Sequence, residues 1–188
     1  QDKLTSRRKL GWKRSQFTAL LLGGAEGMAP LRAIAMTLCA SAMPMQLAVV
    51  CGRNERLRAK LAGMHWPFLA HVYGFVENMP ELMAAADVVV TKAGPSTVME
   101  ALNCGRPLLL SGAIPGQEEG NVRMVVEGGA GWLTPTPERV LERLRALRED
   151  RRRELETAAV AARKLAAPGA ARIVASEIIA LLAEPVIA

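Results

Sequence analysis

The sequence predicts an α/β protein built on a doubly wound parallel sheet of about six strands, with helices on both faces. Short apolar runs alternate six times with segments of helical character along residues 17–136, which is typical of such sheets. Loops rich in glycine, proline or polar residues leave the carboxyl ends of four runs, at residues 23–27, 74–78, 91–96 and 112–117. Ligands of open parallel sheets bind at this edge. The four loops are therefore expected to form a binding crevice.

The strands are expected at continuous apolar runs, because strands buried on both faces of a parallel sheet carry no alternating pattern. These runs are residues 17–22, 46–51, 71–75, 87–90, 107–110 and 131–133. The helices between them are expected at residues 28–41, 54–61, 79–86, 97–104 and 117–127. Pro30 suits the first turn of the first helix, and Asn54 and Asn78 are suited to cap the next two.

The two ends of the chain differ from this core of residues 17–136. Residues 1–16 are polar and basic and are expected to be a linker, such as the tail of a preceding segment. Residues 137–188 are expected to add helices to the same domain. The charged part of this region predicts solvated surface helices, and a break at Pro168 precedes a final apolar-rich helix over residues 170–182.

The composition indicates one globular domain. The chain has 188 residues, of which 51% are hydrophobic and 22% charged, as expected for a well-formed core. The sequence contains no uninterrupted run of about 18 apolar residues, so no membrane span is predicted. No apolar signal segment follows the basic start of the chain. The three cysteines match no zinc or redox spacing. Neither a metal site nor a cofactor is therefore expected.

The charge of the chain is concentrated at its start. The net charge is +6, and residues 1–14 carry six basic side chains and one acidic one. A nucleic-acid-binding domain more often shows a basic stripe with aromatic residues across its folded body, so no nucleic-acid partner is expected. The basic ends suit either an anionic membrane surface or a solvated linker.

Residues 91–100, with the sequence TKAGPSTVME, join the fourth strand to a helix. A helix N-terminus offers unpaired N–H groups and the positive end of its dipole, which suits an anion. Gly94 has no Cβ, so a phosphate can approach the backbone closely there. Lys92 is either a phosphate partner or an ordinary surface lysine. This segment is expected to form one wall of the crevice.

Glu100 has two interpretations. It follows Thr97 by three residues, which is the spacing of a capping box with a structural role. If the helix begins earlier, at Pro95 or Ser96, Glu100 lies in the second turn instead. Its carboxylate is then free to accept hydrogen bonds from the two hydroxyls of a ribose.

The segment 117–121, with the sequence QEEGN, opens another helix at a carboxyl end. Acidic residues are common in a first helical turn because the dipole favours them there. Alternatively, Gln117 and Glu118 bind sugar hydroxyls, for which an amide and a carboxylate are suited.

The glycine-rich segment 23–27 differs from a dinucleotide-binding fingerprint. Leu22 occupies the position of the first glycine, and Cys51-Gly52-Arg53 stands where an acidic residue would end the second strand. A dehydrogenase is therefore not expected. The turn either contacts phosphates or a sugar, or is simply a tight turn.

Five motifs, taken together and in order, resemble the C-terminal half of the monogalactosyldiacylglycerol synthase family. They are Gly23-Gly24-x-Glu26-Gly27-Met28, Cys51-Gly52-Arg53-Asn54, Gly74-Phe75-Val76, Thr91-Lys92-Ala93-Gly94-Pro95-x-Thr97 and Gly116-Gln117-Glu118-x-Gly120-Asn121. The resemblance covers about residues 17–136. The family's bacterial relatives include processive diacylglycerol glucosyltransferases, and the peptidoglycan transferase that adds N-acetylglucosamine to a lipid-linked acceptor is more distantly similar.

The resemblance implies the C-terminal, donor-binding half of a GT-B glycosyltransferase, whose two Rossmann-like domains face each other. The donor would be UDP-glucose or UDP-galactose. The backbone at Phe75 and Val76 would meet the uracil, and Glu100 would hold the ribose. The implied donor-binding residues are Gly24, Glu26, Gly27, Met28, Phe75, Val76, Lys92, Gly94, Pro95, Ser96, Thr97, Glu100, Gln117, Glu118 and Asn121.

The resemblance also implies the chemistry. A base deprotonates a diacylglycerol-type lipid hydroxyl, which attacks the anomeric carbon with inversion while UDP leaves, without a bound metal. The base and the lipid groove belong to the N-terminal half of the family, so this chain is expected to contain no catalytic residue and to transfer nothing alone. The whole protein would be cytoplasmic and peripheral at the cytoplasmic face of the membrane. The alternatives are a non-catalytic nucleotide-binding module and half of a UDP-sugar epimerase.

Overall fold

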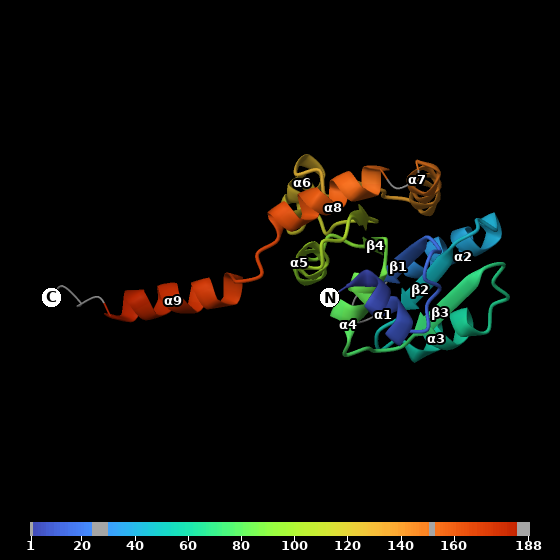
Figure 1. Ribbon diagram of the computed structural model, residues 1–188, viewed down its shortest axis with the longest axis horizontal. Helices are drawn as coiled ribbons and strands as arrows, with labels where there is room; N and C mark the ends of the chain where they lie inside the picture. The colour runs from blue at the N-terminus through green and yellow to red at the C-terminus, as the bar shows by residue number, and fades with distance from the viewer. Residues whose placement is uncertain (1, 24–29, 151–152, 184–188) are drawn as a thin grey trace.

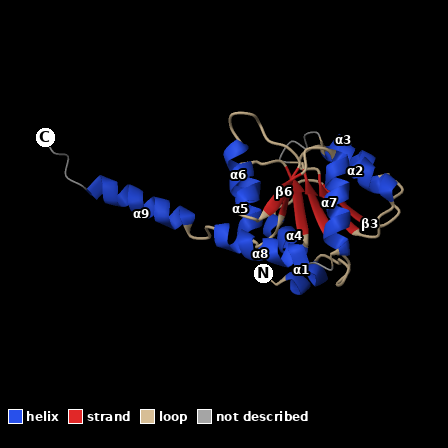
Figure 2. Cartoon of the chain, turned by 90° about the horizontal axis from the view of Figure 1, so that it is seen from above, coloured by secondary structure: helices blue, strands red, loops and turns tan. Residues whose placement is uncertain are grey.

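The computed structural model describes residues 2–23, 30–150 and 153–183. It contains a six-stranded, all-parallel sheet in the order β3-β2-β1-β4-β5-β6 (Figures 1 and 2). The strands are β1 Thr18–Leu22, β2 Gln46–Val50, β3 Leu69–Tyr73, β4 Val88–Thr91, β5 Leu108–Leu110 and β6 Gly131–Leu133. The predicted fold class, an α/β doubly wound parallel sheet, is therefore confirmed.

The helices of the described residues alternate with these strands and then continue beyond them. They are α1 Lys3–Lys9, α2 Leu31–Ser41, α3 Glu55–Ala62, α4 Met79–Ala85, α5 Pro95–Asn103, α6 Glu119–Glu127, α7 Pro137–Glu149, α8 Arg153–Leu165 and α9 Ala170–Ala183. Asn54 caps α3 as predicted, because its side chain accepts a hydrogen bond from the N–H of Leu57. Asn78 precedes α4 but makes no side-chain cap hydrogen bond.

Both faces of the sheet are buried, which explains why its strands are continuous apolar runs. Alternate residues of each strand enter different cores: Leu21 and Val90 pack under α2, α3 and α7, whereas Leu20 and Val89 pack under α4, α5 and α6. Every residue of β1, β2, β4 and β5 is buried. The sheet is thus a rigid middle layer from which the carboxyl-end loops project.

The strand order reverses beside β1. The chain adds β2 and β3 on one side of β1 and then places β4 on the other side, with Leu21 paired to Val90. In open α/β sheets such a reversal leaves a crevice between the loops that leave the two strands in opposite directions. The loops after β1 and β4 are therefore the place to look for a ligand.

The expectation that residues 1–16 are a linker is wrong for much of this segment. Residues Lys3–Lys9 form α1, which packs beside α4, and Arg7 and Trp12 are buried. The Arg7 guanidinium donates hydrogen bonds to the backbone carbonyls of Ala85, Arg14 and Gln16. Within α1 the buried residues are Ser6 and Arg7, so the helix carries no apolar periodicity that sequence reasoning could detect.

The helices after the sheet also differ from the expectation of solvated surface helices. One face of α7 is buried through Val140, Leu144 and Leu147, and α8 buries Leu155 and Ala162. By contrast, residues 170–182 of α9 are exposed, and the helix projects from the body of the domain (Figures 1 and 2). Charged residues on the outward faces of α7 and α8 dominate the sequence there, so the apolar residues on their buried faces were not recognised.

One helical stretch, Arg153–Leu182, is apolar and long enough to cross a membrane by length and composition alone. The structure interrupts this stretch between α8 and α9. The remaining helix α9 has 14 residues, or about 21 Å at 1.5 Å per residue. A hydrocarbon core of about 30 Å needs roughly 20 residues, and over its described residues α9 presents an exposed apolar surface.

Candidate functional site

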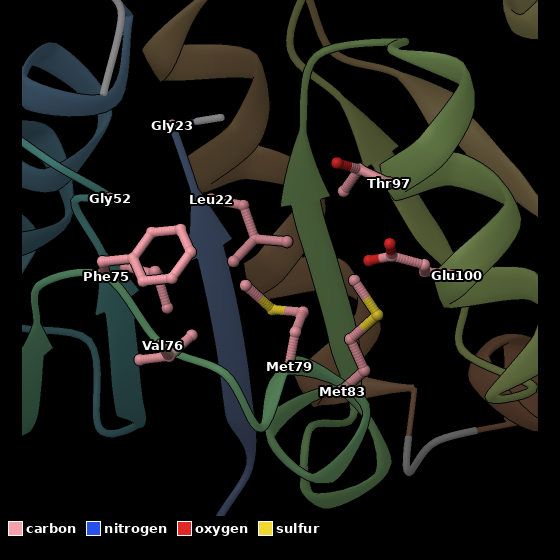
Figure 3. Close-up of a pocket in the computed structure, with 10 residues that line it drawn as sticks. Leu22, Gly23, Gly52, Phe75, Val76, Met79, Met83, Thr97 and Glu100 are labelled. Atoms are coloured by element: carbon pink, nitrogen blue, oxygen red, sulfur yellow. The ribbon is translucent and has the colours of Figure 1, made fainter. Parts of the chain in front are cut away.

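An open pocket of about 110 Å³ lies at the carboxyl edge of the sheet, at the reversal of strand order beside β1. It is lined by residues that leave the ends of β1 and β2, the loop after β3, and helices α4 and α5 (Figure 3). These residues are Leu22, Gly23, Val50, Gly52, Phe75, Val76, Met79, Met83, Thr97 and Glu100. Elements distant in sequence thus converge on one site.

The pocket has an apolar floor and one acidic wall. In the view of Figure 3, Phe75 and Glu100 lie on opposite sides, and Leu22, Met79 and Met83 lie between them. An apolar slot suits a flat ring system, and a carboxylate accepts hydrogen bonds from hydroxyl groups. The arrangement therefore suits a group that joins a planar base to a sugar.

Phe75 reaches the pocket because β3 ends earlier than predicted. The strand was expected at residues 71–75, but it runs from Leu69 to Tyr73. Gly74 and Phe75 consequently belong to the loop, and the Phe75 side chain is 59% exposed at the pocket. Phe75 and Val76 thus both line the pocket, and their contact with a ligand stays a prediction.

Glu100 lies in the second turn of α5, which decides between its two interpretations. The helix begins at Pro95, its N-cap is Gly94, and no side chain caps it. The capping-box interpretation, with Thr97 as the cap, is therefore wrong. Glu100 is exposed and has no hydrogen bond or ion pair with any residue that the structure describes. Its carboxylate is available to a ligand.

The N-terminus of α5 faces the same crevice. Pro95 has no N–H group, and the first helical N–H groups after it, those of Ser96 and Thr97, have no partner within the helix. A Cβ added at Gly94 would meet no atom closer than 3.5 Å, the nearest being Lys92 Cε. Gly94 itself is buried against Lys92 and Glu118, so a ligand meets this helix start at the exposed Ser96 and the half-buried Thr97, where the helix dipole favours negative charge.

Glu118 is held by the protein itself. The residue is 4% exposed, its Oε1 accepts a hydrogen bond from Lys92 Nζ at 2.7 Å, and its Oε2 accepts one from the N–H of Ile114 at 3.0 Å. Burial alone would raise the pKa of Glu118, but the hydrogen bonds from Lys92 and Ile114 lower it overall. The carboxylate fixes the loop after β5 against the end of β4.

Asn121 and Gln117 are placed differently around this loop. Asn121 Nδ2 donates to the carbonyl of Ala93 at 2.8 Å, which ties α6 to the segment before α5. Gln117 is exposed. Whether Gln117 and Glu118 also bind sugar hydroxyls stays a prediction. Helix α6 begins at Glu119 rather than at the expected residue 117.

The glycine-rich turn is only partly visible in the structure. Gly23 lines the pocket, whereas the predicted residues Gly24, Glu26, Gly27 and Met28 lie outside the described residues. A small hollow of about 20 Å³ is also lined by Leu22 and Gly23 and reaches Lys92 and Ser111. Lys92 therefore lies next to the crevice, although its recorded partner is Glu118.

Sequence reasoning missed five lining residues: Leu22, Val50, Gly52, Met79 and Met83. Leu22 and Val50 end strands, so their place at the carboxyl edge follows from the strand assignment. Met79 and Met83 are four residues apart on the helix that follows the β3 loop, so they share one helical face. Their spacing could therefore have indicated that both methionines face the same site.

This fold and this pocket define a Rossmann-like domain of the GT-B glycosyltransferase class. The chain belongs to the glycosyltransferase family 28 C-terminal domain family, whose family model matches residues 18–174. The resemblance predicted from the five motifs is therefore confirmed.

Curated relatives support the assignment. Monogalactosyldiacylglycerol synthase 1 of Arabidopsis thaliana is 38% identical over 177 residues, which cover 90% of this chain and 33% of that protein. MurG of Acinetobacter baumannii has the same fold, with a TM-score of 0.74 and 25% identity over 95% of this chain and 53% of that one. The chain thus spans about a third of the length of the plant relative and about half of MurG.

A solved epimerase also shares the fold. The UDP-GlcNAc 2-epimerase of Neisseria meningitidis, solved with UDP-GlcNAc bound, has a TM-score of 0.62 and 16% identity over 93% of this chain and 47% of that one. At this identity the likeness concerns the fold alone. It does not favour epimerisation over transfer.

Proposed function

We propose that this chain is the donor-binding part of an inverting glycosyltransferase that transfers a hexose from UDP to a diacylglycerol-type lipid. The observation that carries the proposal is the apolar pocket at the reversal of strand order, beside a Glu100 carboxylate that has no hydrogen-bond or ion-pair partner among the described residues. Family membership supports transferase chemistry. The names of the relatives, monogalactosyldiacylglycerol synthases, favour galactose as the sugar and diacylglycerol as the acceptor.

The bound donor extends across the crevice from the pocket to the α5 N-terminus. The uracil occupies the apolar floor near Phe75, and Glu100 accepts hydrogen bonds from the ribose hydroxyls. The diphosphate lies over the N–H groups of Ser96 and Thr97, where the helix dipole stabilises the charge that develops as UDP leaves. Gln117 is the exposed side chain of the β5 loop that can reach sugar hydroxyls.

The acceptor chemistry belongs to the part of the protein beyond this chain. Matched relatives are about three times as long as this chain, and we propose that the remaining part supplies the lipid groove and the base. This chain alone therefore binds donor and UDP but transfers nothing. Helix dipole and backbone N–H groups neutralise the leaving diphosphate, so EDTA leaves the affinity for UDP unchanged.

A titration with four nucleotides tests the proposal. UDP, UDP-galactose, UDP-glucose and NAD are added separately, and the heat of binding is measured. The expected result is saturable binding of all three uridine ligands and none of NAD over the same range. Preferential binding of NAD would overturn the proposal, as would turnover of UDP-galactose onto diacylglycerol by these 188 residues alone.

A further inference from the structure

Phe75 is a large apolar side chain that the core does not hold in place. It is 59% exposed, yet its ring forms one side of the pocket (Figure 3). An exposed phenyl ring on a loop samples several rotamers unless a neighbour restricts it. A base that stacks on this ring binds most tightly if the ring is already held in its stacking orientation, because no rotamer freedom is then lost on binding.

Arg53 supplies the recorded contact to that ring. Its guanidinium carbon lies 5.3 Å from the centroid of Phe75, within the range of a cation–π interaction. Among the described residues Arg53 forms no ion pair. The Arg53 guanidinium is therefore not neutralised by a carboxylate of the described residues, and it contacts the Phe75 ring instead.

The backbone around Arg53 is fixed, so its side chain starts from a defined position. Gly52 adopts a φ of +59°, in the left-handed region that favours glycine. The N–H of Cys51 donates to the carbonyl of Tyr73 at 2.9 Å, which joins the end of β2 to the end of β3. A Cβ added at Gly74 would lie only 3.0 Å from Glu55 Oε1, so the loop after β3 is closely packed against the start of α3.

We infer that Arg53 is a positioning residue for nucleotide recognition: it holds the Phe75 ring in place so that a pyrimidine base can stack on the face that Arg53 leaves free. This inference rests on the proposed function and names the part of the ligand that Arg53 serves. Arg53 acts on the base through Phe75 and not on the phosphates. A stacked base on an aromatic ring is a recurrent mode of recognition.

The test compares uridine with UDP for the Arg53→Ala variant. Uridine has no phosphate, so an effect through the Phe75 ring weakens both ligands by the same factor. A cation–π contact at an exposed site corresponds to a loss of about two- to fivefold. Arg56→Ala is the matched control, because Arg56 is an exposed arginine on the neighbouring helix α3, and it leaves both affinities unchanged.

A double-mutant cycle then tests whether Arg53 acts through Phe75. Phe75→Leu weakens both ligands, and adding Arg53→Ala to that variant causes no further loss. Chemical shifts report the affinities, and thermal melts confirm that each variant is folded. A loss of UDP affinity alone, unchanged affinities, or an equal loss in both Phe75 backgrounds would each overturn the inference.

The failure of the proposed function gives a different result. If the unmodified chain binds neither uridine nor UDP, the donor-site proposal fails and the inference about Arg53 fails with it. If the unmodified chain binds both and Arg53→Ala changes neither, the inference fails alone.

Discussion

Arg7 and Asp87, which are 80 residues apart, form a buried ion pair in which Arg7 Nη2 donates to Asp87 Oδ2 at 2.8 Å. Asp87 also accepts hydrogen bonds from Lys3 Nζ and from the N–H of Thr18. Asp87 directly precedes β4, and the far end of β4 leads into the α5 N-terminus. The ion pair therefore fastens helix α1 to the strand that carries the candidate site.

Arg7→Leu is expected to destabilise the domain by about 3–5 kcal/mol, the usual loss when one partner of a buried ion pair is removed. Asp87 would remain buried, with Lys3 as its remaining ion-pair partner among the described residues. The measurement is the free energy of unfolding by chemical denaturation. Arg8→Ala is the control, because Arg8 is an exposed neighbour on the same helix. A loss below about 1 kcal/mol for Arg7→Leu would contradict the role given to the pair.

The stability of the chain is expected to decrease in acid because of Asp87. Burial alone would raise the pKa of Asp87, but Lys3, Arg7 and the N–H of Thr18 lower it below its ordinary value of 3.8. The unfolded state then binds the proton more readily, so the stabilisation is complete above about pH 4 and is lost as the pH falls through the lowered pKa.

The Asp87→Asn variant tests this pH dependence. Its free energy of unfolding should be lower than that of the unmodified chain at pH 7, and the difference between the two should shrink as the pH falls below 4. Unfolding curves between pH 2 and 7 provide the measurement. A difference that stays constant over this range would show that Asp87 does not titrate as described.

Glu118→Ala is expected to destabilise the loop after β5. The substitution leaves the Lys92 ammonium and the Ile114 N–H without their recorded acceptor, and the loss should be about 1–3 kcal/mol. Glu119→Ala is the matched control, since Glu119 is exposed and next in sequence. Hydrogen exchange of Ile114 should become faster in the Glu118 variant alone. Equal effects of the two substitutions would contradict a structural role for Glu118.

Glu100→Ala is expected to weaken uridine ligands by about 1–3 kcal/mol, because a charged acceptor of ribose hydroxyls is lost. The free energy of unfolding should stay within about 0.5 kcal/mol, since Glu100 is exposed. Calorimetric titration with UDP checks the affinity. Glu127→Ala, which removes an exposed carboxylate at the end of α6, should change neither quantity. Lower stability with unchanged affinity would make Glu100 a structural residue.

The sheet could be predicted from the sequence because its strands are buried on both faces. The strands β1 and β4 each contain one threonine and otherwise only apolar residues, such as Leu20 and Val89, and a short continuous apolar run bounded by turn residues is typical of such a strand. The crevice followed from the same pattern, since parallel strands place all their carboxyl ends at one edge.

What the sequence did not predict depended on individual contacts. Arg7 anchors α1 through a buried charge, which resembles a solvated basic residue in sequence. The contacts of Glu118 with Lys92 and Ile114 were not predicted, because only the folded loop brings these groups together, and its predicted contact with a sugar stays a prediction. The start of α5 decided the interpretation of Glu100, and helix starts are poorly defined by sequence.

The most direct test of the central claim is where UDP binds on this chain. Backbone amide chemical shifts are followed while UDP is added. The expected result is saturable shifts at Phe75, Val76, Thr97 and Glu100, around the pocket beside β1. Saturable shifts confined to the groove near Trp132 and Arg143, at the edge strand β6, or no saturable shifts at all, would contradict it.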